Sequence, residues 1–290
     1  LFEASGHRPD PPRAPQEAPL LELQGVTRDY PAARHGLFRR SAPFRAVSDV
    51  SFTLRRGESL GLVGESGCGK STLTRAILGL EELQGGEIRL DGEKVAAGQH
   101  MPAHMRRKMQ VVFQDPYGSF NPRWRVGRLV AEPFHLTGWP GDTEAHVAEA
   151  LEAVGLSARD AEKYIHEFSG GQRQRIAIAR ALITRPELIV LDEAVSALDV
   201  RVRAQILDLL AELRAQFGLS YLFISHDLSV VRAITDRVLV MQAGRIVERG
   251  GTEAVFADPQ HPYTRELIAA APVLPADWPQ GRTGDAGTLV

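Results

Sequence analysis

A glycine-rich stretch, "GESGCGKSTL" at 64–73, carries the most specific chemistry in the sequence. Gly64, four further residues, and then Gly69, Lys70 and Ser71 fit the pattern G-x-x-x-x-G-K-[ST] in full. Glycines leave room for several backbone N–H groups to approach phosphate oxygens, and they adopt the unusual φ angles that such a loop needs. The stretch predicts a site for nucleotide phosphates, and a glycine turn without a ligand is the alternative interpretation.

The residues around the lysine are predicted to share the binding of a triphosphate. Lys70 would neutralise the β and γ oxygens, and the Ser71 hydroxyl would ligate Mg²⁺. The helix that follows presents its positive amino end, which carries about half a charge. Cys68 is expected to line the nucleotide as well, and the alternative is that it is a small buried residue without a role in binding. The other residues expected to line the nucleotide are Ser66, Gly67 and Thr72.

Two adjacent acids follow an apolar run in "LIVLDE" at 188–193. A buried strand would deliver both carboxylates to its carboxyl end, which is the edge where open α/β sheets bind ligands. Successive side chains of a strand point to opposite faces, so the two acids suit different roles. Asp192 is predicted to hold Mg²⁺ through water, and Glu193 to orient or deprotonate an attacking water. A strand end capped by solvated acids is the alternative.

The elements that must position these residues alternate between strands and helices. Alternating apolar and polar residues, or short buried runs, indicate strands, and longer amphipathic stretches indicate helices. The pattern implies an α/β fold whose mostly parallel sheet is covered on both faces. Strands are expected at 20–30, 45–54, 57–64, 106–115 (ending at Gln114), 187–193 and 220–227, hairpins at 85–95 and 237–250, and helices at 71–80, 144–156, 172–185 and 201–218.

Composition argues against several classes of protein. The chain has 290 residues, 43% of them hydrophobic, and a net charge of −2, which does not favour a polybasic nucleic-acid binder. The single cysteine, Cys68, allows neither an internal disulfide framework nor a cysteine-built metal cluster. No apolar run approaches the ~20 residues of a membrane helix. Residues 1–19 are rich in proline and polar groups and are expected to form a flexible lead-in.

A third motif makes a family resemblance specific. The stretch "EFSGGQRQR" at 167–175 resembles the Leu-Ser-Gly-Gly-Gln signature of ATP-binding cassette (ABC) ATPases, with Phe168 in place of the leucine. Gln114 in "VVFQD" resembles the glutamine of the Q-loop, and "SALD" resembles the D-loop. His226 in "FISHD" resembles the switch histidine, and Tyr30 in "TRDYP" resembles the aromatic residue that stacks on adenine. A structural histidine and a core tyrosine are the alternatives for the last two.

The resemblance covers roughly residues 20–270 and implies a fold. That fold is a P-loop NTPase with a RecA-like mixed sheet, helices on both faces and an antiparallel β subdomain. A helical subdomain would be inserted at about 117–171. Residues 20–250 would then form the nucleotide-binding domain and residues 251–290 a C-terminal tail of the oligopeptide-transporter type.

The resemblance also implies roles for single residues. ATP and Mg²⁺ would be the cofactors, Glu193 the general base and Lys70 an electrostatic clamp. Gln114 and His226 would also act in catalysis, and Gln114 would contact the metal. A second small-residue turn opens the helix at 172–185 and would bind the ATP of a partner chain, so that two chains meet head to tail. The residues of that turn expected to contact the partner's nucleotide are Ser169, Gly171 and Gln172.

Two local stretches resemble the subfamily that energises peptide and nickel uptake in bacteria. They are "FQDPYGSFNPR" at 113–123, beside the Q-loop, and "HPYTRELIAAAP" at 261–272. The resemblance implies an ATP-hydrolysing subunit that is peripheral to the cytoplasmic face of the inner membrane. A second ABC ATPase, a paralogue, and two integral-membrane permease subunits would be its partners, with an extracytoplasmic substrate-binding protein as an indirect one. No nucleic acid and no iron–sulfur cluster are expected.

The loop at 116–124 is expected to grip a short cytoplasmic helix of the permease. Tyr117, Phe120 and Trp124 would supply its apolar surface, and packing within the helical insert is the alternative for these aromatic residues. Two other functions compete with import. One is a soluble ABC ATPase that remodels DNA or ribosomes, and the other is the ATPase of an exporter.

Overall fold

The structure is a computed structural model that describes residues 19–31, 34–35, 39–40, 44–97, 101–115 and 118–270. For 34–35 and 39–40 it describes the backbone only. Of the predicted lead-in, only Pro19 is described, and the predicted contact residue Tyr117 lies outside the described residues. The same holds for the part of the predicted tail beyond Ala270.

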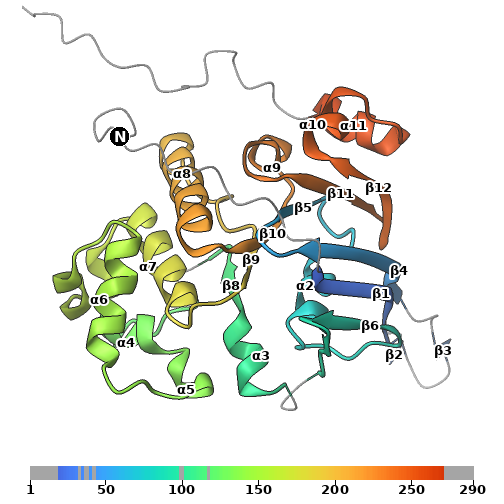
Figure 1. Cartoon of the computed structure of the whole chain (residues 1–290). Coiled ribbons are helices and arrows are strands. Elements are labelled where there is room, and N and C mark those ends of the chain that lie inside the picture. Colours follow the sequence, from blue (N-terminus) through green and yellow to red (C-terminus); the bar gives the residue numbers. More distant parts are fainter. Residues whose placement is uncertain are drawn as a thin grey trace, which may run out of the picture.

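A six-stranded sheet forms the centre of the molecule, in the order β12-β11-β5-β10-β9-β8 (Figure 1). Neighbouring strands are parallel except in the β11–β12 hairpin. All residues of β5 and β10 are buried, as expected for strands covered on both faces. The strands are β5 (Ser59–Val63), β8 (Met109–Phe113), β9 (Leu188–Asp192), β10 (Ser220–Ser225), β11 (Arg237–Gln242) and β12 (Arg245–Gly251).

Alternate residues of this sheet face two separate hydrophobic cores. In β9, Leu188 and Val190 pack into one core, whereas Ile189 and Leu191 pack into the other. The first core contains α2 (Lys70–Ile77), and the second contains α7, α8 and α9. Helices therefore lie on both faces of the sheet, as predicted. The helices of the second core are α7 (Gly170–Leu182), α8 (Val200–Phe217) and α9 (Leu228–Ile234).

An antiparallel sheet, β4-β1-β6-β7, packs on the α2 side and contributes to the first core. The predicted hairpin at 85–95 is present, and its turn uses Asp91 (φ 53°) and Gly92 (φ 77°), the left-handed pair typical of two-residue hairpins. Its strands are β1 (Pro19–Tyr30), β4 (Phe44–Arg55), β6 (Gly85–Leu90) and β7 (Glu93–Lys94), and a separate pair is β2 (Arg34–His35) with β3 (Arg39–Arg40).

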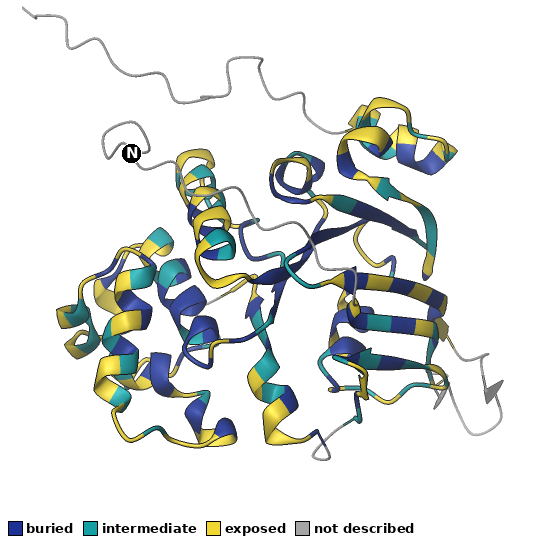
Figure 2. Cartoon of the chain, viewed as in Figure 1, coloured by how far each residue is buried: buried dark blue, intermediate teal, exposed yellow. Residues whose placement is uncertain are grey.

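Short helices fill the stretch where the sequence predicts a helical insert. They pack with α7 in the second core, where Val126, Leu129 and Leu151 are among the fully buried residues. Figure 2 shows the central strands buried along their length, whereas the outer faces of α6 and α8 are exposed. The helices are α4 (Val126–Ala131), α5 (Phe134–Thr137), α6 (Thr143–Ala153), and the 3₁₀ turns η2 (Ala158–Glu162) and η3 (Ile165–Glu167).

The strand predicted at 106–115 is shorter than expected. Its first three residues, Arg106 to Lys108, form the last turn of α3 (Ala103–Lys108), and the strand begins at Met109. Three basic side chains at a helix carboxyl end interact favourably with the helix dipole. The described part of the chain ends with α10 (Thr252–Ala257) and α11 (Pro262–Ala270). None of the described helices is both long and apolar enough to cross a bilayer.

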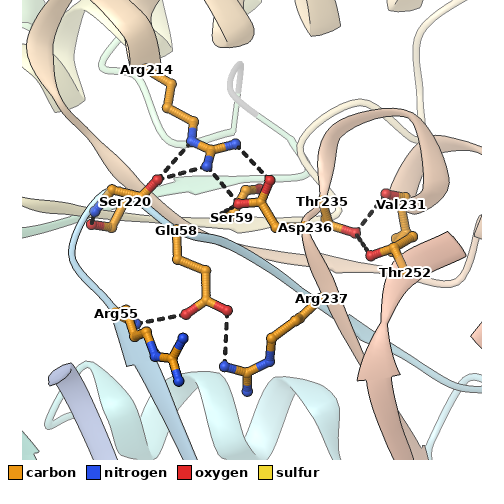
Figure 3. A network of polar contacts seen from close by, with 11 residues as sticks. Arg55, Glu58, Ser59, Arg214, Ser220, Val231, Thr235, Asp236, Arg237 and Thr252 are labelled. Carbon is orange, nitrogen blue, oxygen red and sulfur yellow. Dashed lines mark hydrogen bonds and ion pairs between the residues drawn. The ribbon is translucent and has the colours of Figure 1, made fainter. Parts of the chain in front are cut away.

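A polar network ties together the amino ends of the parallel strands (Figure 3). Arg214, near the end of α8, donates to the carbonyl of Gly57 and to the Asp236 carboxylate. Asp236 in turn accepts from the backbone N–H of Ser59 at 2.8 Å. The buried Glu58 pairs with Arg237 at 3.0 Å. These contacts connect the amino ends of the strands, whereas the predicted site lies at their carboxyl ends.

Candidate active site

Parallel strand register brings four of the predicted site segments to one edge of the sheet. Val63 pairs with Ser225, Ile224 pairs with Asp192, and Asp192 pairs with Phe113. The residues that follow these strand ends lie side by side, because parallel strands share their carboxyl edge. The residues so placed are Gly64, Gln114, Glu193 and His226.

Two glycines of the loop are required by space as well as by conformation. A Cβ on Gly64 would lie 2.2 Å from the carbonyl oxygen of Met241, and one on Gly69 would lie 2.3 Å from that of Ala46. Gly69 also has a φ of 112°, which favours glycine. At Gly67 (φ 82°) a Cβ would meet nothing within 4 Å, so that position faces open space. The loop is therefore packed against the strands on one side and open on the other.

Lys70 is buried and its ammonium lies inside the loop. The Nζ donates to the carbonyl oxygens of Gly64 at 2.7 Å and Glu65 at 2.9 Å. Cys68 is also buried, with its Sγ 3.9 Å from Lys70 Nζ, and burial raises the pKa of its thiol. Ser71, on the first turn of α2, is exposed. A cation and a hydroxyl at the amino end of a helix suit an anionic ligand.

Tyr30 reaches the same helix from the end of β1. Its hydroxyl lies 3.2 Å from that of Thr72 and donates to the Glu81 carboxylate at 2.9 Å. Arg75 donates to both Tyr30 and Glu81, and the Arg28 guanidinium lies 4.9 Å from the centre of the ring. The ring is thus fixed beside the first turn of α2. Stacking of adenine on it stays a prediction.

The two acids at the end of β9 occupy different environments. Burial, followed by the charge of Glu193, raises the pKa of Asp192, and Lys70 opposes this shift only in part. Glu193 has a φ of 52°, an uncommon conformation for a residue with a side chain. Its backbone is held there by an N–H bond to Ile224 O and by Ser196, whose N–H and Oγ donate to the Glu193 carbonyl. The turn fixed by these bonds directs the Glu193 carboxylate away from the strand.

The carboxylate of Glu193 contacts the predicted switch histidine. Its Oε1 lies 3.2 Å from Nδ1 of His226. The His226 side chain is 54% exposed and that of Glu193 24%, so both remain accessible from the edge of the sheet. Gln114 is exposed one residue beyond the end of β8. The structure therefore gathers the predicted base, histidine and glutamine on neighbouring strand ends.

The signature residues lie apart from this edge. Ser169 caps α7: its Oγ accepts from Gln172 N, and Gln172 Oε1 accepts from Ser169 N at 3.0 Å. A Cβ on Gly171 would lie 2.6 Å from Cγ1 of Val202, so this glycine lets α7 approach α8. Helices α7 and α2 pack on opposite faces of the sheet, so the two glycine turns open helices on different sides of it (Figure 1).

The donor set of the edge fits a magnesium nucleotide. Mg²⁺ keeps few protein ligands and takes the rest of its oxygens from phosphate and water. Asp192 and Gln114 stand at neighbouring strand ends and offer a carboxylate and an amide, and Ser71 adds a hydroxyl on the first turn of α2. Within the described ranges no group of three or more His, Cys, Asp or Glu side chains is arranged to hold a metal alone.

An open groove of about 680 Å³ lies beside the end of β8. Its apolar lining includes Phe113, Trp124, Leu136 and Trp139, and the side chains of Leu136 and Trp139 are more than half exposed. Phe120 does not line it: it is 5% exposed and packs in the second core under Arg180. Of the described aromatic residues predicted for docking, Trp124 thus faces the groove and Phe120 belongs to the interior.

Comparison with known proteins decides the family. The sequence profile described as "ABC transporter" matches residues 47–196, which is about half of the chain. The dipeptide transport ATP-binding protein DppF of Haemophilus influenzae is 48% identical over 262 residues, covering 89% of this chain and 80% of DppF. The chain belongs to the ABC transporter family. The family that the sequence motifs predict is therefore confirmed.

Other relatives of this ABC transporter family member extend the comparison. The glutathione import ATP-binding protein GsiA of Salmonella typhimurium and that of Escherichia coli are each 52% identical, over 88% of this chain. The chain spans 41% of the length of these relatives. Among solved structures, cbiO1 from Clostridium perfringens aligns with a TM-score of 0.72 at 27% identity, over 83% of this chain and 92% of cbiO1.

A second solved structure also confirms the predicted fold class. It is a dimeric post-hydrolysis state of the ATP-binding cassette MJ0796 bound to ADP and Pi. Its TM-score is 0.68 at 27% identity, over 80% of this chain and 98% of that chain. The predicted P-loop NTPase architecture, with its mixed sheet and antiparallel β sheet, is that of an ABC ATPase cassette.

One contact of the loop has no counterpart among the predicted site residues. The hydroxyl of Tyr263, on α11, accepts a hydrogen bond of 2.9 Å from the backbone N–H of Glu65. The sequence marks Tyr263 only as part of a family-like C-terminal stretch. A pattern within 261–272 gives no sign of which loop it touches, because that contact spans nearly 200 residues.

Proposed function

We propose that this chain is the ATP-binding and ATP-hydrolysing subunit of a bacterial ABC importer for peptides or metal chelates. The observation that carries the proposal is the gathering of the glycine-rich loop, Asp192, Glu193, His226 and Gln114 on one edge of the sheet. The peptide-type substrate is supported by DppF and GsiA, whose names describe dipeptide transport and glutathione import.

In this proposal each residue has a role that follows from its position. Lys70 and the amino end of α2 bind and orient the β and γ phosphates. Ser71, Asp192 and Gln114 would hold Mg²⁺, which when bound would supply positive charge to the phosphate oxygens. Glu193 accepts a proton from the attacking water, and His226, 3.2 Å away, orients that carboxylate.

The ATP site is completed by a second chain. The amino end of α7, with Ser169 at its cap, cannot turn toward the loop of its own chain, because α7 and α2 pack on opposite faces of one sheet. Head-to-tail association presents Ser169, Gly171 and Gln172 to the ATP on the partner. The dimeric structure of the cassette MJ0796 supports the association of two cassettes, and the proposed partner is a paralogous ATPase subunit.

The groove beside β8 is the proposed docking site of a permease helix at the cytoplasmic face of the inner membrane. Its position is supported by chain continuity, because Phe113 lines the groove and Gln114 follows it at the ATP site. Three arginines and one glutamate line the groove, which favours an amphipathic helix with acidic side chains. Movement of such a helix would act directly on the position of Gln114.

Purification from the native membrane tests the proposal. We expect the full chain to be retained with integral-membrane subunits in detergent and to hydrolyse ATP in that complex, whereas Lys70→Ala should abolish ATP binding at the glycine-rich loop of this chain and lower the ATPase rate of the complex. Retention of ribosomes or DNA instead of membrane subunits would favour a remodelling ATPase. Absence of ATP binding by the wild-type complex would refute the proposal altogether.

A further inference from the structure

Helix α11 reaches the glycine-rich loop with a buried side chain, that of Tyr263. Tyr263 is 6% exposed and packs in the second core, on the face of the sheet opposite to α2. Its hydroxyl accepts from the backbone N–H of Glu65 at 2.9 Å. The loop is therefore held from both faces of the sheet: by α2, which continues its chain, and by a residue almost 200 positions later.

The same peptide unit is held on its other side by the lysine of the loop. Gly64 and Glu65 share one peptide plane, in which the C=O and the N–H point in opposite directions because the bond is trans. Lys70 Nζ donates to that C=O at 2.7 Å, and Tyr263 accepts from that N–H at 2.9 Å. Lysine, peptide and tyrosine form one chain of hydrogen bonds, in which each bond polarises the next.

The position of α11 is itself fixed by a carboxylate. Glu248, on β12, accepts from the backbone N–H groups of Gln260 at 2.7 Å and His261 at 3.0 Å. Nδ1 of His261 accepts from the backbone N–H of Tyr263 at 3.2 Å. These contacts set the first turn of α11, so the tyrosine ring enters the core at a defined place.

We propose that Tyr263 is a positioning residue for the nucleotide site, whose hydroxyl fixes the Gly64–Glu65 peptide and thereby the ammonium of Lys70. Without this acceptor the Glu65 N–H would lack a partner in a part-buried place, and the peptide could rotate and release its carbonyl from Lys70. The loop would then have to be reordered when ATP binds. The inference rests on the proposed function, since it assigns a support to the proposed ATP site.

Replacement of the hydroxyl alone tests this role. Tyr263→Phe keeps the ring in the core and removes only the acceptor. We expect the ATP dissociation constant to rise about threefold to tenfold, because one hydrogen bond is lost from the binding-competent loop. In the nucleotide-free protein, hydrogen–deuterium exchange at the Glu65 amide should become faster by a similar factor.

Tyr221→Phe is the matched control. Tyr221 is likewise a buried tyrosine whose hydroxyl is bonded to the backbone, but it donates to the carbonyl of Leu210 at 2.9 Å and lies near the start of β10. The Tyr221→Phe variant should be less stable than the wild type, with an unchanged ATP dissociation constant and unchanged hydrogen–deuterium exchange at Glu65. In a Glu65→Pro background, which lacks the N–H, Tyr263→Phe should have no further effect on ATP binding.

The outcomes separate this inference from the proposed function. Unchanged ATP affinity and unchanged exchange at Glu65 in Tyr263→Phe, with wild-type protein that binds ATP, would overturn the positioning role. If Tyr263→Phe and Tyr221→Phe changed ATP affinity and exchange at Glu65 equally, the positioning role would also be overturned, because both changes would then reflect a general loss of stability. Wild-type protein that does not bind ATP would refute the proposed function, while exchange at Glu65 would still decide whether Tyr263 holds the loop.

Discussion

Replacement of Glu193 by glutamine isolates the proposed proton acceptor. The glutamine side chain has nearly the same size as the glutamate and could keep the 3.2 Å contact with His226. The backbone at φ 52° and its bonds to Ile224 and Ser196 do not involve the side chain. The change should therefore remove a base without a cavity or a broken fold. Loss of a general base typically lowers the rate ~10²–10⁴-fold, or about 2.7–5.4 kcal/mol in the barrier.

The assay compares hydrolysis with binding in the same preparation. Phosphate release at the ATP site that uses Glu193 should fall by that factor in the Glu193→Gln variant at saturating ATP, while the ATP dissociation constant of that site stays close to that of the wild type. ATP should also hold the two ATPase subunits together for longer, because hydrolysis no longer separates them. Glu253→Gln, which breaks the exposed pair with Arg232, is the control and should hydrolyse ATP normally. Wild-type turnover by Glu193→Gln would refute the assignment of the base.

Three further predictions concern stability and docking. Burial alone would raise the pKa of Glu248, but hydrogen bonds to its carboxylate, including those from Gln260 and His261, outweigh burial and lower the pKa. The ionised carboxylate therefore stabilises the fold at pH values above the unfolded pKa of 4.5, and this contribution is lost as the pH falls through the native pKa. Glu248→Gln should accordingly lower the urea midpoint at pH 7 and not at acid pH. Arg214→Leu should cost about 2–4 kcal/mol of unfolding free energy, by removing bonds at the amino end of the sheet, and leave ATP affinity unchanged; an effect on affinity with none on stability would contradict this. Trp124→Ala should leave ATP binding intact and reduce assembly with the permease, and normal assembly with normal coupling of hydrolysis to transport would count against the groove.

Local patterns are sufficient to predict the loop, the acids and most of the elements. The glycine spacing of 64–71 and the apolar run before Asp192 each describe a strand end, and such ends meet wherever strands are parallel. The helix predicted to end at Gly218 does so, because Gly218 adopts φ 65° at the cap of α8. These features depend on neighbours within a few residues, which a sequence displays directly.

Contacts between distant segments could not be predicted. Nothing near Tyr263 indicates that its hydroxyl meets Glu65, and nothing near Tyr30 indicates that Glu81 and Arg75 hold its ring. Phe120 and Trp124 look alike in a loop rich in aromatic residues, yet only the packing of α4 and α7 decides that one is buried and the other lines a groove. The strand before Gln114 is shorter than its pattern predicts for a related reason, since basic residues 106–108 fit a strand or a helix end equally well.

The central claim is that one ATP lies between two chains, each of which supplies half of its site. The most direct measurement is a structure of the Glu193→Gln transporter complex with ATP and Mg²⁺. We predict Ser169 Oγ at hydrogen-bond distance, about 3 Å, from the γ-phosphate bound to the partner's glycine-rich loop. A complex in which every γ-phosphate is contacted by one ATPase chain alone, with Ser169 remote from all of them, would contradict the account.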